Sequence, residues 1–384
     1  PYRGRVDVLP TGRNMFTTDP RAVPTRSAFA QGERLADEMI RRHLQDEGDW
    51  PRGVIVDLWG SATMRTAGEE FAMALALLGV KPVWDKGSER VSGIEVVPLA
   101  EMDRPRIDAT LRVSGLFRDV FPTLTALYAQ AVRVLSARDE APDMNPFVQG
   151  RETARVYGPA PGDYGLGMTA MLDDYSEESR NAAGQAWIKA SSWALDGEGA
   201  ICDEDGLRAR LEGADTFVHL QDLPETDLLL ASDYAAHEAG FAAAKAQVGG
   251  AGDGKAALWH LDNTDPERPR TRSLREEIAR VVQARAANPD WIAGMRAHGF
   301  RGAAEIAATL EHMADFAHLS GTVGPHLFDL YYEATLNDAA TQDFLKEANP
   351  EAFAAMRTRF QALMEAGLWQ TRRNSVRAGL EAEK

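Results

Sequence analysis

The stretch Gly53-Val54-Ile55-Val56-Asp57-Leu58-Trp59 predicts the fold of this chain. It is a near-continuous apolar run of strand length, as found in strands buried on both faces of a parallel sheet. A loop of small residues follows, then a helical pattern through Gly79, and then the strand-like run Lys81-Pro82-Val83-Trp84. This order predicts a βαβ unit.

The same alternation of elements extends to either side of this stretch. Ile94 to Leu99 and Ile107 to Val113 are strand-like runs that each precede a polar loop, and Val120 to Leu135 has helical spacing. Upstream, the pattern predicts an amphipathic helix from about Arg26 to Gln45. We therefore expect an α/β fold with a largely parallel sheet and flanking helices.

After about residue 140, Ala and Leu at helical spacing replace the β-branched runs as far as the C-terminus. Ser273 and Glu276 form a capping box, and Asn349-Pro350 has the pattern of another helix start. The sequence thus predicts two domains. Residues 1–140 form an α/β domain with ligand loops at its strand ends, and residues 141–384 form a mostly α-helical domain.

Length and composition are those of a globular chain. Its 384 residues contain 44% hydrophobic and 26% charged residues, which suffices for about two domains with a sizeable core. The formal net charge of −16 disfavours nucleic acid as a partner, because like charges repel. Cys202 is the only cysteine, so the chain can form neither an internal disulfide nor a thiolate cluster, and we expect a cytoplasmic protein.

Neither a membrane span nor a leader is predicted. The apolar run from Phe71 to Val80 is about half as long as a transmembrane helix. The chain begins at Pro1 without Met, which is typical of a segment of a longer protein.

The loop from Trp59 to Gly68 is the strongest candidate for a ligand site. It follows the carboxyl end of a predicted strand, where parallel sheets bind ligands. An aromatic ring, several hydroxyl groups and Arg65 can hold a flat anionic ligand by stacking and charge-assisted hydrogen bonds. The alternative is a plain turn with Trp59 in the core and Arg65 in solvent. Ser114 to Asp119 follows a second strand and is expected near the same edge, although Arg118 and Asp119 can also pair at a helix start.

The common nucleotide and hydrolase motifs are incomplete. Gly249, Gly254 and Lys255 have phosphate-loop spacing, but Ala256 occupies the place of the magnesium-binding hydroxyl, and a helical pattern precedes them. His237-Glu238 lacks the second histidine of a zinc-protease helix. We therefore predict no nucleotide site in this chain.

Two histidines are candidates for metal binding or proton transfer. His260 and Asp262 are two residues apart and point to one side if their segment is extended. His237 lies on an Ala-rich helical pattern. Each imidazole can equally be a satisfied core or surface histidine.

The chain resembles the large subunit of the cobaltochelatase and magnesium chelatase family in motifs that keep the family's order from about Pro10 to Trp369. Thr63-Met64-Arg65-Thr66 and Pro266-Glu267-Arg268-Pro269-Arg270 are more similar to the cobalt branch. The other matching motifs include Pro10-Thr11-Gly12-Arg13-Asn14, Trp59 to Gly68, Leu78 to Trp84, Arg104 to Asp108, Ser114 to Asp119, Tyr164 to Gly167, Asp262-Asn263, Asn288 to Trp291 and Gly294 to Phe300.

This resemblance implies ATP-dependent insertion of Co²⁺ into hydrogenobyrinic acid a,c-diamide in aerobic cobalamin biosynthesis. In the family, separate AAA+ motor subunits use the ATP and Mg²⁺. A magnesium chelatase subunit acting on protoporphyrin IX and a non-catalytic docking platform for the motor are the alternatives. A family motif with a glutamate assigned to metal insertion does not occur here, so we expect the segment alone to be inactive.

The resemblance and the strand-end loops together predict the site. Imidazole and carboxylate suit Co²⁺, and local arginines suit a substrate with several carboxylates. The predicted metal ligands are His237 and His260, and the candidate catalytic residues are His260 and Asp262. The predicted substrate-binding residues are Arg13, Asn14, Trp59, Thr63, Arg65, Ser114 and Arg118.

Overall fold

The computed structural model describes residues 19–149, 154–249, 256–373, 376 and 380. The chain divides into two compact units. Unit 1 comprises residues 1–167, 188–222 and 248–271, and unit 2 comprises residues 168–187, 223–247 and 272–384. The boundary that the sequence predicts near residue 140 falls inside unit 1, and later strands return to that unit.

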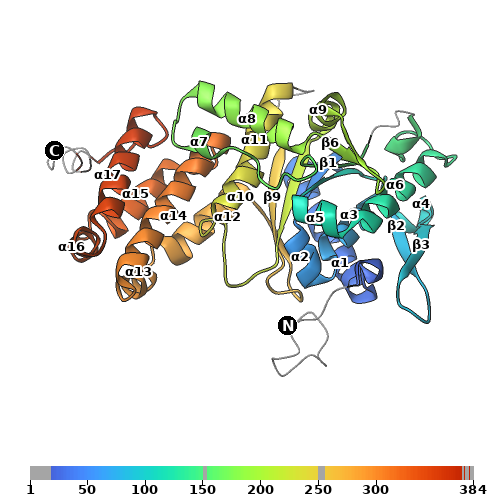
Figure 1. Ribbon diagram of the computed structural model, residues 1–384, viewed down its shortest axis with the longest axis horizontal. Helices are drawn as coiled ribbons and strands as arrows, with labels where there is room; N and C mark the ends of the chain where they lie inside the picture. Colours follow the sequence, from blue (N-terminus) through green and yellow to red (C-terminus); the bar gives the residue numbers. More distant parts are fainter. Residues whose placement is uncertain (1–18, 150–153, 250–255, 374–375, 377–379, 381–384) are drawn as a thin grey trace. The chain divides into compact units, whose positions relative to one another are not determined.

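Among the described residues, eight strands form one sheet in the order β10-β9-β8-β1-β4-β5-β6-β7 (Figure 1). Neighbouring strands from β9 through β5 pair in parallel, whereas β6 pairs antiparallel with both β5 and β7. The predicted α/β fold with a largely parallel sheet is therefore confirmed. The strands are β1 (Gly53–Leu58), β4 (Asp108–Val113), β5 (Val156–Gly158), β6 (Trp193–Leu195), β7 (Ala200–Cys202), β8 (Thr216–Gln221), β9 (Ala257–Asp262) and β10 (Arg270–Ser273).

Helices of unit 1 cover an apolar face of this sheet. Helix α1 (Arg26–Glu47) packs against α3 (Glu69–Leu78), and both contribute to the core that includes Val54, Val56 and Leu58. The two helices approach so closely at Gly32 that a β-carbon there would lie only 2.5 Å from that of Ala72. The remaining helices of unit 1 are η2 (Pro20–Ala22), α2 (Gly60–Thr66), α4 (Leu99–Met102), α5 (Gly115–Val120), α6 (Pro122–Ser136), η3 (Pro146–Gln149) and α9 (Glu204–Gly213).

The predicted βαβ unit is wrong in its second strand. Val80–Trp84 (β2) does not join the large sheet but pairs antiparallel with Val91–Val96 (β3) in a separate hairpin. Pro82 explains the difference, because a proline has no N–H to donate within a central strand. The next strand along the chain that lies beside β1 is β4, and the strand predicted over Ile107 to Val113 is thereby confirmed.

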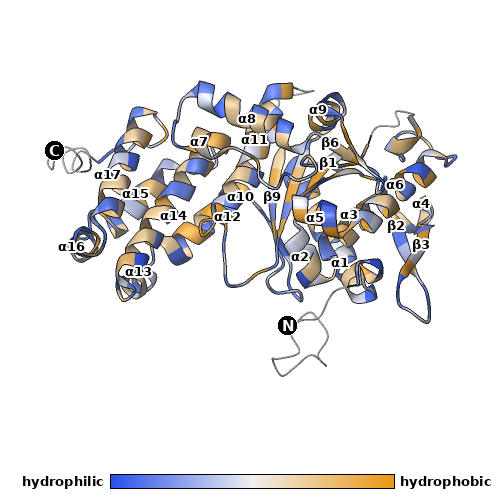
Figure 2. Cartoon of the chain, viewed as in Figure 1, coloured by the Kyte–Doolittle hydropathy of each residue, from blue (hydrophilic) through white to orange (hydrophobic). Residues whose placement is uncertain are grey.

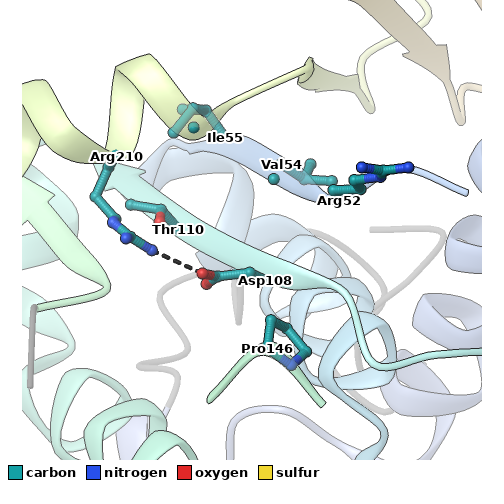
Figure 3. Close-up of a pocket in the computed structure, with 9 residues that line it drawn as sticks. Arg52, Val54, Ile55, Asp108, Thr110, Pro146 and Arg210 are labelled. Atoms are coloured by element: carbon teal, nitrogen blue, oxygen red, sulfur yellow. Dashed lines mark hydrogen bonds and ion pairs between the residues drawn. The ribbon is translucent and has the colours of Figure 1, made fainter. Parts of the chain in front are cut away.

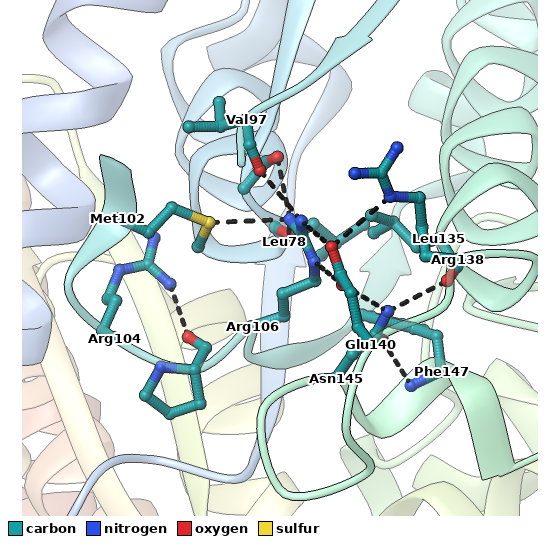
Figure 4. A network of polar contacts seen from close by, with 12 residues as sticks. Leu78, Val97, Met102, Arg104, Arg106, Leu135, Arg138, Glu140, Asn145 and Phe147 are labelled. Carbon is teal, nitrogen blue, oxygen red and sulfur yellow. Dashed lines mark hydrogen bonds and ion pairs between the residues drawn. The ribbon is translucent and has the colours of Figure 1, made fainter. Parts of the chain in front are cut away.

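A buried arginine ties the hairpin to the rest of unit 1 (Figure 4). The Arg106 guanidinium donates to the carbonyls of Leu78, Gly79 and Val97 and forms a bidentate pair with Glu140 at 2.7 and 2.8 Å. This pairing holds the pKa of Glu140 down at about 2. Every donor direction of the guanidinium thus has an acceptor, which is what burial of a charge requires.

Unit 2 is built from helices whose hydrophilic and hydrophobic residues alternate along each ribbon (Figure 2). The capping box of Ser273 and Glu276 is confirmed at the start of α12, and Asn349 caps α17 as predicted. The helices are α7 (Thr169–Leu172), α8 (Glu177–Ser191, whose last turn belongs to unit 1), α10 (Ser232–Tyr234), η4 (Ala235–Ala239), α11 (Gly240–Val248), α12 (Leu274–Val281), η5 (Val282–Ala286), α13 (Pro289–Arg296), α14 (Gly299–Ser320), α15 (Pro325–Ala334), α16 (Ala339–Ala348) and α17 (Pro350–Glu365). In the described part of the chain, no helix has the length and apolarity needed to cross a bilayer.

Candidate functional site

The two faces of the central strands differ in chemistry. Residues paired in register on parallel strands project to the same face, and the face alternates along each strand. One face carries the apolar row Val56 and Val218 and its neighbours, which belong to the core. The opposite face carries, on four adjacent strands, the row Arg112, Asp57, His219 and His260. We call these four residues the polar row.

The polar row is buried. Each of its side chains belongs to a residue that is at most 3% exposed. Burial lowers the pKa of Arg112, and the neighbouring Asp57 opposes this shift. Charged groups are retained in such surroundings only where they are paired, so the contacts within the row decide its electrostatics.

Asp57 is the centre of these contacts. Its Oδ1 accepts a hydrogen bond from Arg112 Nη1 at 3.3 Å, and its Oδ2 lies 3.1 Å from His219 Nδ1. The indole Nε1 of Trp59 donates to the same Oδ2 at 2.7 Å. Arg112 is held in turn by Ser191 Oγ at 3.1 Å. A carboxylate at Nδ1 selects the tautomer of His219 in which Nε2 carries the lone pair.

Three rings lie together at the carboxyl ends of β1, β8 and β9. The Trp59 ring meets the His219 ring edge-on at a centroid distance of 4.9 Å. The rings of His219 and His260 are 6.0 Å apart. The structure thus places two of the predicted site residues, Trp59 and His260, on either side of a histidine that the sequence analysis did not single out.

Arg65 also lies near the carboxyl ends of these strands, but it is already paired and so is not free to bind a ligand as predicted. Its Nε and Nη2 form a bidentate pair with the carboxylate of Asp222 at 2.8 and 2.9 Å. Burial, with a smaller contribution from the charge of Asp222, raises the pKa of the nearby Glu70 carboxyl to about 8. The positive charge of Arg65 therefore balances the negative charge of Asp222, close to the buried carboxyl of Glu70.

A second set of buried hydrogen bonds joins the carboxyl end of β9 to α1 and α3. Asn263 Nδ2 donates to Glu69 Oε2 at 2.6 Å, and Gln31 Nε2 donates to Asn263 Oδ1 at 2.9 Å. Asn263 is fully buried, and Gln31 and Glu69 nearly so. These bonds fix the end of β9 against α1 and α3.

Several predicted substrate-binding residues organise the backbone. The expected loop after Trp59 is in fact the helix α2, and the Thr63 hydroxyl donates to the Trp59 carbonyl at 3.1 Å. Ser114 Oγ accepts from the N–H groups of Gly60 and Phe117 at 3.0 and 3.2 Å, which joins the starts of α2 and α5. Gly60 is required there, because a β-carbon would lie 2.5 Å from Phe117 N.

Arg118 holds a neighbouring segment. It donates to the carbonyls of Pro159, Ala160 and Asp163 and pairs with Asp119 at 2.7 Å. Its side chain is only 9% exposed. The predicted ion pair with Asp119 is thus present. The guanidinium also holds the backbone of residues 159–163 through hydrogen bonds to its carbonyl groups.

The other predicted residues have structural roles, belong to unit 2 or lie outside the described residues. Asp262 Oδ1 accepts from the N–H and hydroxyl of Thr264 at 3.1 and 2.7 Å and shapes the turn after β9. His237 lies in η4 of unit 2, whereas His260 lies in unit 1. Arg13 and Asn14 lie outside the described residues, as does most of the Gly249 to Lys255 loop. Among the described residues, no group of three or more His, Cys, Asp or Glu side chains is arranged to hold a metal ion.

Sequence reasoning missed Asp57 and His219 as site residues. Asp57 could have been noticed, because it is the one charged residue inside the apolar run of β1. His219 lies in Thr216–Gln221, which was hidden in a region expected to be mostly helical. No local pattern indicates that β8 lies beside β1, since residues 57 and 219 are 162 positions apart.

The largely parallel sheet with flanking helices places the chain in the α/β class, and the Asp57–His219 pair lies toward the carboxyl ends of its central strands. The model of the family described as CobN/Magnesium Chelatase matches residues 1–376. The chain belongs to this family.

Cobaltochelatase subunits are among its similar relatives. The aerobic cobaltochelatase subunit CobN of Sinorhizobium sp is 42% identical over 98% of this chain, and that of Pseudomonas aeruginosa is 41% identical over 96%. The magnesium-chelatase subunit ChlH of Oryza sativa subsp. japonica is 29% identical over 95%. The catalytic subunit of cobaltochelatase from Mycobacterium tuberculosis matches with a TM-score of 0.90 and 34% identity, covering 99% of this chain and 33% of that one. The chain spans 31% of the length of the two CobN relatives.

Proposed function

We propose that this chain provides the macrocycle-binding part of a cobaltochelatase that inserts Co²⁺ into hydrogenobyrinic acid a,c-diamide in aerobic cobalamin biosynthesis. The observation that carries the proposal is the polar row, with Trp59 beside it at the carboxyl edge of the sheet. The higher identity to the cobaltochelatase subunits than to the magnesium-chelatase subunit favours cobalt over magnesium.

The chemistry of metal insertion matches the residues of this row. Two pyrrole protons must leave the macrocycle, and the incoming ion must lose water. His219 has its Nδ1 against the Asp57 carboxylate, so a proton taken up at Nε2 would be stabilised by a buried negative charge. His260 is a second imidazole close enough to share that task or to contact Co²⁺, a metal that accepts imidazole nitrogen readily.

Substrate recognition is assigned to Trp59 and Arg65. The indole offers a flat surface at the strand end, and the guanidinium offers a fork that fits a carboxylate arm of the corrinoid precursor. Because Arg65 is paired with Asp222, a substrate carboxylate would have to replace Asp222. The proposal keeps four further residues in substrate binding. Ser114 and Arg118 would act indirectly, by holding the backbone near the carboxyl ends of the strands, and the other two are Arg13 and Asn14.

ATP hydrolysis is assigned to partner AAA+ subunits, with their own Mg²⁺. Ala256 in place of a magnesium-binding hydroxyl supports this division. The competing role is a docking platform that transmits the motor's movement without binding the macrocycle.

A binding experiment tests the proposal. Quenching of tryptophan fluorescence by hydrogenobyrinic acid a,c-diamide is measured with the full-length subunit, with protoporphyrin IX as the comparison ligand. We expect tighter binding of the corrinoid and its loss when Trp59 is replaced by Leu. Equal binding by the Trp59→Leu and parent proteins would contradict a site at this edge, and preference for protoporphyrin IX would favour a magnesium chelatase.

A further inference from the structure

Glu70 is a buried acid with few hydrogen-bond donors around it. It lies in the first turn of α3 and is 2% exposed. In the described part of the chain, its side-chain donor is the Thr66 hydroxyl, which lies 3.3 Å from Oε2 but only 2.9 Å from the Ala62 carbonyl. Because a hydroxyl has a single proton and the carbonyl is nearer, Glu70 receives at most a shared hydrogen bond.

Other little-exposed acids of unit 1 have a guanidinium partner. Asp57 accepts from Arg112 at 3.3 Å. Asp108, in the wall of a pocket at the amino ends of β1 and β4, accepts from Arg210 at 2.7 Å (Figure 3). Glu70 has no such cation among the described residues, and a buried acid without one keeps its proton. Burial accordingly raises the pKa of Glu70 to about 8.

Helix α2 brings Asp222 near this carboxyl group. The Arg65 guanidinium holds Asp222 at 2.8 and 2.9 Å, and the next residue along the helix, Thr66, contacts Glu70. The side chain of Asp222 is 7% exposed, so water screens its charge only weakly. After burial, this charge is the next cause of the raised pKa of Glu70.

The end of β9 brings the same two acids together from a second side. The backbone N–H of Asn263 donates at 2.8 Å to the carbonyl of Gln221, the residue before Asp222. Its side-chain amide donates at 2.6 Å to Glu69, the residue before Glu70. The neighbouring charges that shift the pKa of Glu70, those of Asp222 and Glu69, are both negative. Ionisation of Glu70 would therefore add a third negative charge to this cluster.

We propose that Glu70 is a positioning residue of the macrocycle site, whose protonated carboxyl group donates a hydrogen bond to Asp222 when a substrate carboxylate takes the Arg65 guanidinium. This inference rests on the proposed function. Displacement of Asp222 would otherwise leave a buried carboxylate without a partner, which is costly. A protonated Glu70 supplies the donor that Asp222 loses, whereas an ionised Glu70 would repel it. Binding of a macrocycle with carboxylate arms therefore requires the proton on Glu70.

The pH dependence of binding tests this role. Quenching of tryptophan fluorescence by hydrogenobyrinic acid a,c-diamide is measured with the full-length subunit from pH 7 to pH 9. Because Glu70 loses its proton near pH 8, the dissociation constant of the parent protein should rise about tenfold over this range. Glu70→Gln keeps an N–H donor that does not titrate, so its affinity should match that of the parent at pH 7 and change little up to pH 9. Glu47→Gln alters an exposed carboxylate on α1 and is the matched control, which should keep the pH dependence of the parent.

A second set of variants separates this role from a structural one. Glu70→Met removes the donor and should weaken binding at pH 7 by about tenfold or more. This loss should vanish when Asp222→Asn is also present, because displacement then leaves no charge that needs the Glu70 donor. A purely structural role of Glu70 would weaken binding equally with and without Asp222→Asn.

The outcomes distinguish this inference from the proposed function. Circular dichroism confirms that each variant is folded. Equal pH dependence of the parent and Glu70→Gln proteins, or an equal loss from Glu70→Met in both backgrounds, would overturn the role of Glu70 and leave the proposed function intact. The absence of binding to the parent at every pH, or undiminished binding by Trp59→Leu, would overturn the proposed function and this inference with it.

Discussion

The imidazole Nδ1 of His219 lies 3.1 Å from Oδ2 of Asp57, and both residues are almost fully buried on adjacent parallel strands. The same carboxylate oxygen accepts the indole N–H of Trp59. One aspartate therefore fixes both a candidate base and the aromatic ring next to it.

Replacing His219 should abolish most cobalt insertion. His219→Gln keeps a polar side chain but cannot take up a proton near neutral pH, so turnover should fall by about 100-fold or more. Asp57→Asn should also lower turnover, because the tautomer of His219 is no longer selected. Insertion is measured with the full-length subunit, saturating motor subunits and ATP, and normalised to folded protein.

His298→Ala is the control for this experiment, since His298 is an exposed residue in unit 2. It should leave turnover unchanged. Normal insertion by His219→Gln would mean that proton transfer takes place elsewhere. In that case His260→Ala and His237→Ala identify which of the two predicted metal ligands matters.

Arg65 and Asp222 should have opposite effects on affinity for the macrocycle. Arg65→Ala removes a charge-assisted hydrogen bond to a substrate carboxylate and should weaken binding by about 1.5–3 kcal/mol. Asp222→Asn frees the guanidinium from its bidentate partner and should preserve or tighten binding. Fluorescence titration measures both. Equal weakening by the two variants would show that the pair only stabilises the fold.

Stability should decrease with rising pH because of Glu70. Burial raises the pKa of this carboxyl to about 8, whereas in the unfolded chain it is near its ordinary value of about 4.5. Between these values the folded state holds a proton that the unfolded state has lost, so each pH unit costs up to about 1.4 kcal/mol. Urea unfolding of the parent and Glu70→Gln proteins from pH 5 to pH 8 measures the slope.

The Glu70→Gln variant should show a shallower decline in stability with pH. Asp315 in unit 2 should supply part of the remaining slope, because burial also raises its pKa to about 8. Identical slopes for the parent and Glu70→Gln proteins would mean that Glu70 is ionised in the folded state at neutral pH.

Arg106 should be essential for stability. Arg106→Met removes the bidentate partner of Glu140 and one donor from each of three backbone carbonyls, which should cost about 3–5 kcal/mol of the free energy of unfolding. Arg138 pairs with the same Glu140 at 3.4 Å but is half-exposed, so Arg138→Met should cost about 1 kcal/mol or less. Urea unfolding compares the two, and equal costs would contradict the central position of Arg106.

The sequence by itself determined the elements whose signal is local. The apolar run of β1, the amphipathic pattern of α1 and the capping box of α12 each specify their structure within a few residues, and the order of the family motifs specified the family. Trp59 was singled out because it follows a recognisable strand, whereas His260 was singled out by its spacing from Asp262 and by the family resemblance. The hairpin of β2 was mispredicted although Pro82 signalled it, because hydrophobicity alone does not distinguish a sheet strand from a hairpin strand.

Only the tertiary structure decided which polar groups meet. Strand order places β8 between β1 and β9, and this order brings His219 between Asp57 and His260. It also decided that Arg65 faces Asp222 and that Arg210 reaches Asp108 at the far end of the sheet. Pairing of parallel strands depends on crossovers of many residues, whose path is set by packing of the whole unit rather than by any short segment.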